Sequence, residues 1–144
     1  MIGLDVKRMF FDTKAVRRRV DKATRRVLSR FGAFVRKTAR RSIRKRKKAS
    51  TPGKPPSSHT GLLKKFIWFA YEAIRRSVVI GPLRLSKRGR GEAPSLLEHG
   101  GVTMMESRRK GERTKARIRP RPFMGPAMEK EKDQLAALWR DSVK

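Results

Sequence analysis

The side chains that could act as general bases, nucleophiles or metal ligands are few and far apart in this sequence. Histidine occurs only at His59 and His99, and cysteine is absent. A lone imidazole without a nearby carboxylate or a second ligand is more often structural than catalytic. Glu129, Glu131 and Asp133 cluster in the first turns of a predicted helix, where we expect them to be solvated and where the helix dipole favours acidic side chains. We therefore expect no catalytic residue, no metal site and no cofactor.

The sequence also lacks the patterns required for two functions that act on phosphate groups, which are nucleotide binding by a P-loop and metal-dependent nuclease activity. The run from Lys87 to Gly91 is basic and contains glycine, but it has neither the glycine spacing nor the Lys-Ser/Thr ending of a P-loop. A nuclease that uses divalent metal needs two or three convergent carboxylates, and no such set stands out. An enzyme, such as a nuclease, is the least favoured of the functions that we consider.

Basic residues dominate the chemistry that the chain does offer. Lys and Arg number 40 against 12 Asp and Glu, so the net charge is +28 and internal pairing can neutralise fewer than a third of the cations. Self-repulsion of this size favours a nucleic acid, an anionic surface or an acidic protein as partner. The residues that we expect to face DNA or a partner are Arg17, Arg18, Lys22, Arg25, Arg26, Arg36, Lys37, Arg40, Arg41, Arg44, Lys45, Arg46, Lys47 and Lys48.

A long amphipathic helix is predicted to position these cations. Asp12 and Thr13 are good N-caps, and a helix from Thr13 to about Arg46 would be about 50 Å long at about 1.5 Å per residue. Part of it should therefore project from a small domain or reach a neighbouring subunit. The apolar stripe that we expect to be buried comprises Val16, Val20, Ala23, Val27, Phe31, Phe34 or Val35, Ala39 and Ile43.

The chain of 144 residues is long enough for one domain with extensions. We divide it into a basic helical segment (residues 1–48), a Pro- and Gly-rich loop (49–61) and a sheet with a C-terminal helix (62–144). A loop of this composition is disordered when nothing holds it. We favour an assembly contact as its support, and the alternative is that it lies along its own domain.

The third segment predicts two strand pairs and a final helix. Leu62–Tyr71 and Ser77–Ile80 are rich in aromatic and β-branched residues, which indicates a hairpin with its turn near Glu72–Arg75. A helix over Leu62–Ile74 is the main alternative. A short helical turn starts at Pro94 and stops at Gly100 and Gly101.

Val102–Met105 and Ala116–Arg119 form the second predicted pair, and an amphipathic helix covers about Pro126–Val143 with Ala127, Leu135, Leu138 and Trp139 among its apolar positions. The predicted fold class is α+β, with the N-terminal and C-terminal helices packed on a small, mainly antiparallel four-stranded sheet.

The sequence offers little that would read nucleic-acid bases. Phe66, Trp68 and Tyr71 could stack on single-stranded bases, although Phe66 and Trp68 are more simply core residues of a strand. Zinc fingers are excluded by the missing cysteines, and no helix-turn-helix signal stands out. The mode of nucleic-acid binding that is left is contact with backbone phosphates, which does not depend on the base sequence.

The apolar runs are all short. The longest, Phe66–Ala70, suits a strand and falls far below the roughly 20 residues of a membrane span. The N-terminus also lacks the apolar h-region of about 7–15 residues that a signal peptide requires. We expect a soluble protein that is made in the cytoplasm and does not enter a membrane.

Short motifs between residues 52 and 130 fall in an informative order. They are PGKPP (52–56), HTGLL (59–63), VIGP (79–82), LEHGG (97–101) and RPRPFMGPAM (119–128). Together they resemble the tail-completion and head-tail joining proteins of bacteriophages, the group that includes the minor tail protein Z type. The positions that carry the resemblance are Pro52, Gly53, Pro55, Pro56, Thr60, Gly61, Leu62, Gly81, Pro82, Leu97, Glu98, Gly100, Gly101, Arg121, Pro122, Phe123, Pro126 and Ala127.

The resemblance implies a virion structural protein at the head-tail junction, made in the bacterial host and acting in a homo-oligomeric ring that is commonly sixfold. Its partners would be other neck and tail proteins and duplex DNA, bound without sequence preference. It brings no catalytic residue. Physically, Gly53, Gly61, Gly81 and Gly101 would allow tight turns, and Pro126 would start the last helix, with Phe123 and Met124 in the core at its beginning. The alternative is a general basic nucleic-acid-binding protein of ribosomal or nucleoid type.

Overall fold

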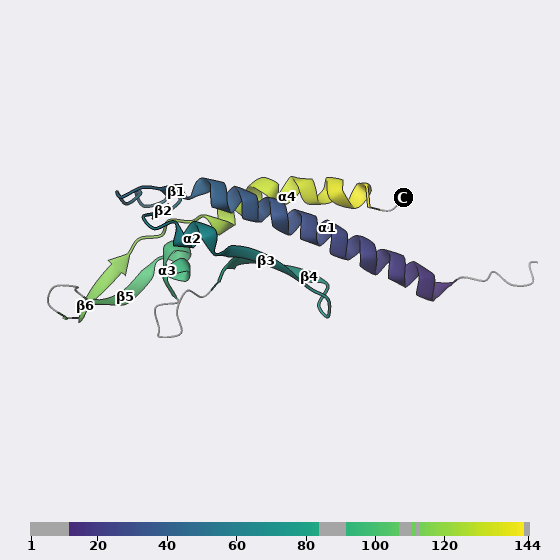
Figure 1. Cartoon of the computed structure of the whole chain (residues 1–144), viewed down its shortest axis with the longest axis horizontal. Coiled ribbons are helices and arrows are strands. Elements are labelled where there is room, and N and C mark those ends of the chain that lie inside the picture. Colours follow the sequence, from purple (N-terminus) through teal and green to yellow (C-terminus); the bar gives the residue numbers. More distant parts are fainter. Residues whose placement is uncertain (1–11, 84–91, 107–110, 112, 143–144) are drawn as a thin grey trace, which may run out of the picture.

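The computed structural model describes residues 12–83, 92–106, 111 and 113–142. The predicted α+β class is confirmed. The elements are α1 (Thr13–Ser42), β1 (Arg44–Lys45), β2 (Ser57–Ser58), α2 (Leu62–Lys65), β3 (Ile67–Glu72), β4 (Ser77–Pro82), α3 (Ala93–His99), β5 (Gly101–Glu106), β6 (Arg113–Ile118) and α4 (Met124–Arg140). The two long helices lie side by side, and the hairpins lie on one side of them (Figure 1).

Helix α1 begins as the sequence predicts and ends earlier than predicted. The Asp12 carboxylate accepts a hydrogen bond from the Ala15 backbone N–H at 2.9 Å, as an N-cap does. The helix ends at Ser42, because Ile43 adopts an extended backbone that places its side chain, 0% exposed, in the core. Arg44 and Lys45, predicted to be helical, instead pair in parallel with β2.

The hydrophobic core forms where α1, α2, β3 and the start of α4 meet. Its buried members are Phe31, Val35, Ala39, Ile43, Leu63, Ile67, Phe123 and Ala127. Helix α4 packs along α1, and the Thr38 hydroxyl donates to the buried Glu131 carboxylate between them. The expectation that Glu131 is solvated is therefore wrong, because the packing of α4 on α1 buries its carboxylate, which is satisfied by Thr38.

The predicted apolar stripe of α1 is buried only over part of the helix. Ala23, Val27, Phe31, Val35, Ala39 and Ile43 are buried, whereas Val16 and Val20 are 42% and 50% exposed. The prediction that Val16 and Val20 are buried is therefore wrong for this chain by itself. The reason is geometric, because the N-terminal end of α1 extends past the elements that cover the rest of the stripe (Figure 1).

Strands β3 and β4 pair in antiparallel register, and the hairpin that they form packs against α1. Gly32 marks the crossing, since a Cβ there would lie 2.9 Å from side-chain atoms of both Phe69 and Val78. Residues 62–65 form the short helix α2 rather than the start of β3, so the helical alternative was correct for those residues alone. Gly81 was predicted to allow a turn, but it lies within β4 opposite Trp68.

The β5–β6 hairpin is a separate two-stranded unit. Among the described residues the four long strands thus make two independent pairs rather than one continuous sheet. Figure 1 shows β5–β6 reaching away from α1 and α4. Val102, Met104 and Met105 on β5 are each more than half exposed.

The Pro- and Gly-rich loop is held by its own chain. The Gly53 N–H donates to the Pro120 carbonyl at 2.9 Å, and the Arg121 Nε donates to the Ser50 carbonyl at 2.9 Å. Pro56 is fully buried. These contacts support the alternative that the loop lies along its own domain, and the loop needs no assembly contact to be ordered.

Candidate functional site

The predicted cations cover the outer surface of α1 and continue past its end. Twelve of the fourteen are exposed, and Arg36 and Arg40 are half-buried. The ion pairs among the described residues are Arg76–Asp21, Arg75–Glu72 and Lys132–Glu129, so none of these fourteen cations is paired there. The described surface of α1 is therefore strongly positive.

Two of the predicted cations also make contacts within the chain. Arg26 donates from Nη2 to the Ser142 carbonyl at 3.4 Å, just beyond the C-terminal end of α4. Arg36 donates from Nε to the Ile67 carbonyl at 2.8 Å, and its guanidinium carbon lies 4.8 Å from the centroid of the Trp68 ring. Arg36 thus belongs both to the cationic surface and to the contact between α1 and β3.

Trp68 is not the core residue that the sequence predicts. Its side chain is 49% exposed, because it lies on the face of β3 opposite to Ile67 and Phe69, which face α1. Phe66 is half-buried at the end of α2 and does not share a strand face with it. Trp68 is instead stacked with Arg36, an arrangement in which a cation over an aromatic face is favourable.

A hollow of about 350 Å³ lies where α1 and α2 meet. Its lining consists of Ala33, Arg36, Lys37, Arg40, Arg41 and Lys64. Lys64 was not among the predicted site residues, because only the fold brings α2 beside this part of α1. We call this feature the cationic hollow.

The motif residues form a joint between the loop, α3 and α4. The Glu98 carboxylate accepts hydrogen bonds from the backbone N–H groups of Phe123 (2.8 Å), Met124 (3.0 Å) and Gly125 (2.8 Å). These are the unpaired donors at the beginning of α4, where a carboxylate is also favoured by the helix dipole. The Arg121 N–H donates to the Leu97 carbonyl at 2.6 Å. The resemblance motifs 97–101 and 119–128 are therefore linked by direct contacts.

The remaining motif residues have structural roles. Gly53, Gly61, Gly100 and Gly101 have positive φ angles, as turn and cap positions require. Phe123 is 1% exposed, and Met124 packs against the core as predicted. Helix α4 begins at Met124, so Pro126 lies in its first turn, where a missing N–H costs nothing, rather than at its start.

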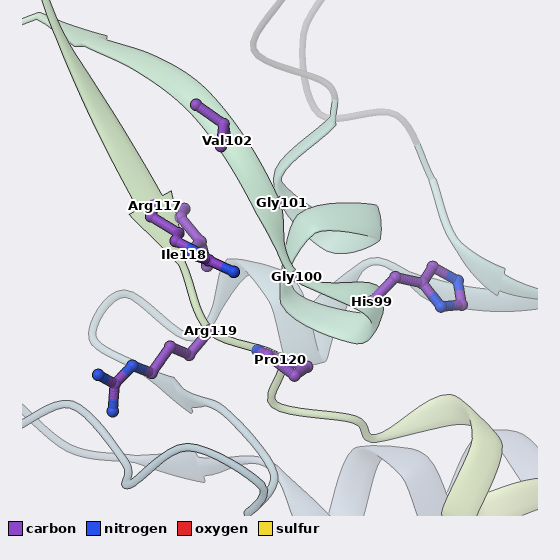
Figure 2. Close-up of a pocket in the computed structure, with 8 residues that line it drawn as sticks. All are labelled: His99, Gly100, Gly101, Val102, Arg117, Ile118, Arg119 and Pro120. Atoms are coloured by element: carbon purple, nitrogen blue, oxygen red, sulfur yellow. The ribbon is translucent and has the colours of Figure 1, made fainter.

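A second hollow, of about 600 Å³, lies at the base of the β5–β6 hairpin (Figure 2). It is lined by His99, Gly100, Gly101, Val102, Arg117, Ile118, Arg119 and Pro120. Figure 2 shows that the side chains of His99, Val102 and Arg119 point in different directions. The lining therefore does not converge on a point where a reacting group would be held.

No group of three or more His, Cys, Asp or Glu side chains in the described part of the chain is arranged to hold a metal ion. His59 and His99 are both exposed. None of the helices within the described residues is both long and apolar enough to cross a membrane.

Comparison with models of known protein families, with curated proteins and with solved structures gave no match.

Proposed function

We propose that this chain is a subunit of a phage neck or tail-completion ring, which joins the tail to the head-tail junction and surrounds duplex DNA through contacts that do not read sequence. The five motifs and their order support this type of assembly, because they resemble those of phage tail-completion and head-tail joining proteins. The surface of α1 supplies the charge that DNA would meet. The proposed role is structural and involves no catalysis.

The exposed β5–β6 hairpin is the main structural support for the proposal that this chain is part of an assembly. An isolated two-stranded hairpin is at best marginally stable in water, because it lacks a third strand or a packed face. Here Val102 is 63% exposed, Met104 55% and Met105 54%. Val102 and Met104 lie on one face of β5 and Met105 lies on the other. Exposed apolar side chains on an arm that stands clear of the core are typical of a surface that another subunit covers. Val16 and Val20 at the projecting end of α1 are a second such surface.

The charge supports DNA as a further partner. A net charge of +28 on 144 residues opposes close packing of subunits unless a polyanion offsets it. Duplex DNA carries about one negative charge per 1.7 Å of its axis, which makes it an effective counterion for a ring of such subunits. Acidic surfaces on neighbouring neck proteins would offset the charge that faces away from the DNA.

The test is the assembly state of the purified chain, measured by light scattering and by electron microscopy of the particles with and without duplex DNA. We expect a closed symmetric oligomer with a central hole that admits a duplex. The double variant Val102→Ser/Met105→Ser should lose the oligomer and keep the melting temperature of the core, because both side chains are exposed in the single chain.

Met128→Ser is the matched control, since Met128 is 43% exposed on α4 and away from the hairpin. It should assemble like the unchanged chain. A monomer that binds duplex DNA tightly and never closes into a ring would contradict the proposal, and it would favour the general nucleic-acid-binding alternative.

A further inference from the structure

We propose that the cationic hollow between α1 and α2 is a binding site for the phosphate groups of a duplex nucleic-acid backbone. This inference rests on the proposed function only in that DNA lies against α1. It goes further by assigning the contact to one place on a helix that carries cations on most of its surface.

The cations of the hollow come together from two helices. Arg36, Lys37, Arg40 and Arg41 lie on neighbouring turns of α1, and Lys64 reaches the same hollow from α2. Side chains three and four residues apart share a helix face, so four of these charges repel one another along α1. Adding Lys64 from a second element increases that repulsion. An anion in the hollow would offset it.

The Arg36 side chain is already fixed in position by contacts with β3. Its Nε atom donates to the Ile67 carbonyl at 2.8 Å, and the guanidinium stacks over Trp68 at 4.8 Å from the ring centroid. These contacts leave the terminal Nη atoms to donate to a ligand. A half-buried arginine held in this way loses less side-chain entropy on binding a phosphate than a free surface lysine does.

No acidic side chain lines the hollow to compete with a bound anion. The lining of the hollow contains no carboxylate, and Ala33 is its only uncharged member. None of its five cations takes part in the ion pairs found within residues 12–83, 92–106, 111 and 113–142. Within the described part of the chain, the hollow is thus not a salt-bridge network whose charges are already matched.

The density of charge favours phosphate over an acidic protein segment. The hollow is open, and five of its six lining residues are cations. A protein partner would need apolar burial to compensate for its ordering, whereas phosphodiesters gain affinity by releasing condensed counterions. A nucleic-acid backbone also presents successive anions along the row that α1 provides.

The experiment compares Lys64→Gln with Lys65→Gln. The two residues are adjacent on α2, and both substitutions remove one positive charge, but only Lys64 lines the hollow. Binding of the full-length chain to a short duplex of mixed sequence would be followed by fluorescence anisotropy over a range of salt concentrations. Melting temperatures of both variants should match that of the unchanged chain.

We expect Lys64→Gln to weaken binding about eightfold at 0.1 M salt and to reduce the slope of log K against log salt by about 0.9, which is the loss of one phosphate contact. Lys65→Gln should change Kd by less than about twofold, because an exposed charge without a close phosphate is screened. Arg36→Lys keeps the charge and loses the fixed guanidinium, so it should also weaken binding. Lys37→Arg should not.

Equal effects of Lys64→Gln and Lys65→Gln would overturn the proposed site, and so would failure of the unchanged chain to bind duplex. Polyglutamate serves as the second probe. If Lys64→Gln weakens polyglutamate binding as much as duplex binding, the hollow takes an acidic protein and the phosphate proposal is wrong. A chain that forms no ring but shows the Lys64 dependence retains this site and loses the proposed function. A ring without that dependence retains the function and loses the site.

Discussion

Phe123 connects the β5–β6 hairpin to the main helix pair through its position at the start of α4. Its ring is 1% exposed and belongs to the same core as Phe31, Val35 and Ile67. The sequence predicted this burial correctly, because a large apolar side chain directly before an amphipathic helix is well placed to pack in the core. Because the ring is large and buried, a substitution at Phe123 tests how much the packing at the beginning of α4 contributes to stability.

We predict that Phe123→Ala lowers the free energy of unfolding by about 3–5 kcal/mol, since it removes a large apolar group and leaves a cavity. Urea titration followed by circular dichroism measures the change. Met128→Ala serves as the control, because Met128 is exposed on the same helix. A loss of less than about 1 kcal/mol for Phe123→Ala would mean that the ring does not contribute to the core as the structure indicates.

Sequence patterns predicted single residues well only where the cause was local. Asp12 as N-cap and the positive φ of Gly53 and Gly61 follow from the chemistry of the residues themselves. Trp68 was misassigned, because its exposure depends on which face of β3 turns towards α1, and Lys64 was missed for a similar reason. An arginine and a tryptophan that meet across 32 positions of sequence leave no signal in a local pattern.

At the scale of elements, α3 and α4 are joined by one side chain. Glu98 lies in the last turns of α3 and accepts from the first backbone N–H groups of α4. The carboxylate therefore fixes the direction in which α4 leaves the hairpin. The sequence placed Glu98 in a motif but gave no indication that its partners are residues 123–125, because those residues follow the whole β5–β6 hairpin.

We predict that Glu98→Gln destabilises the protein by about 1–3 kcal/mol, because an amide provides one acceptor oxygen in place of two and carries no charge for the helix dipole. Amide hydrogen exchange should also become faster at residues 123–125. Glu129→Gln is the control, since its partner Lys132 is 3.6 Å away on the exposed surface of α4. Unchanged exchange at residues 123–125 in Glu98→Gln would show that the carboxylate does not hold the beginning of the helix.

Element boundaries differed from prediction where a tertiary contact overrode local preference. Residues 44 and 45 are basic and suit a helix, yet burial of Ile43 and pairing with β2 end the helix before them. Val16 and Val20 continue the apolar period of α1 correctly, but none of the elements that the structure describes covers them fully. Periodicity identifies the face of a helix that is suited to burial, and the length of the neighbouring elements decides how much of it is buried.

At the scale of the whole molecule, the basic helix and the sheet segment share one core. Helix α1 contributes Phe31, Val35 and Ala39, and the segments after residue 61 contribute Leu63, Ile67, Phe123 and Ala127. The predicted segments 1–48 and 62–144 are therefore not separable bodies, and removing the helix would expose this core. Tests of the basic surface must use point substitutions in the intact chain.

The position of the positive charges, and not only their number, should govern DNA binding by the intact chain. Arg40, Arg41, Arg44 and Lys45 lie on and after the C-terminal end of α1, whereas Arg113, Lys115, Arg117 and Arg119 lie on and after β6. Replacing either set with glutamine lowers the net charge by the same amount, so a difference between the variants reports position and not total charge.

We expect the α1 set to reduce the slope of log K against log salt by about 2–4, at about 0.9 for each lost phosphate contact, and the β6 set to reduce it by less than about 1. Binding should also be indifferent to duplex sequence within about tenfold, because phosphate contacts carry no sequence information. Both variants should melt as the unchanged chain does, since these side chains lie outside the buried core. Equal slopes would mean that DNA meets the whole charged surface and not α1, and a strong sequence preference would require base contacts that the proposed ring does not make.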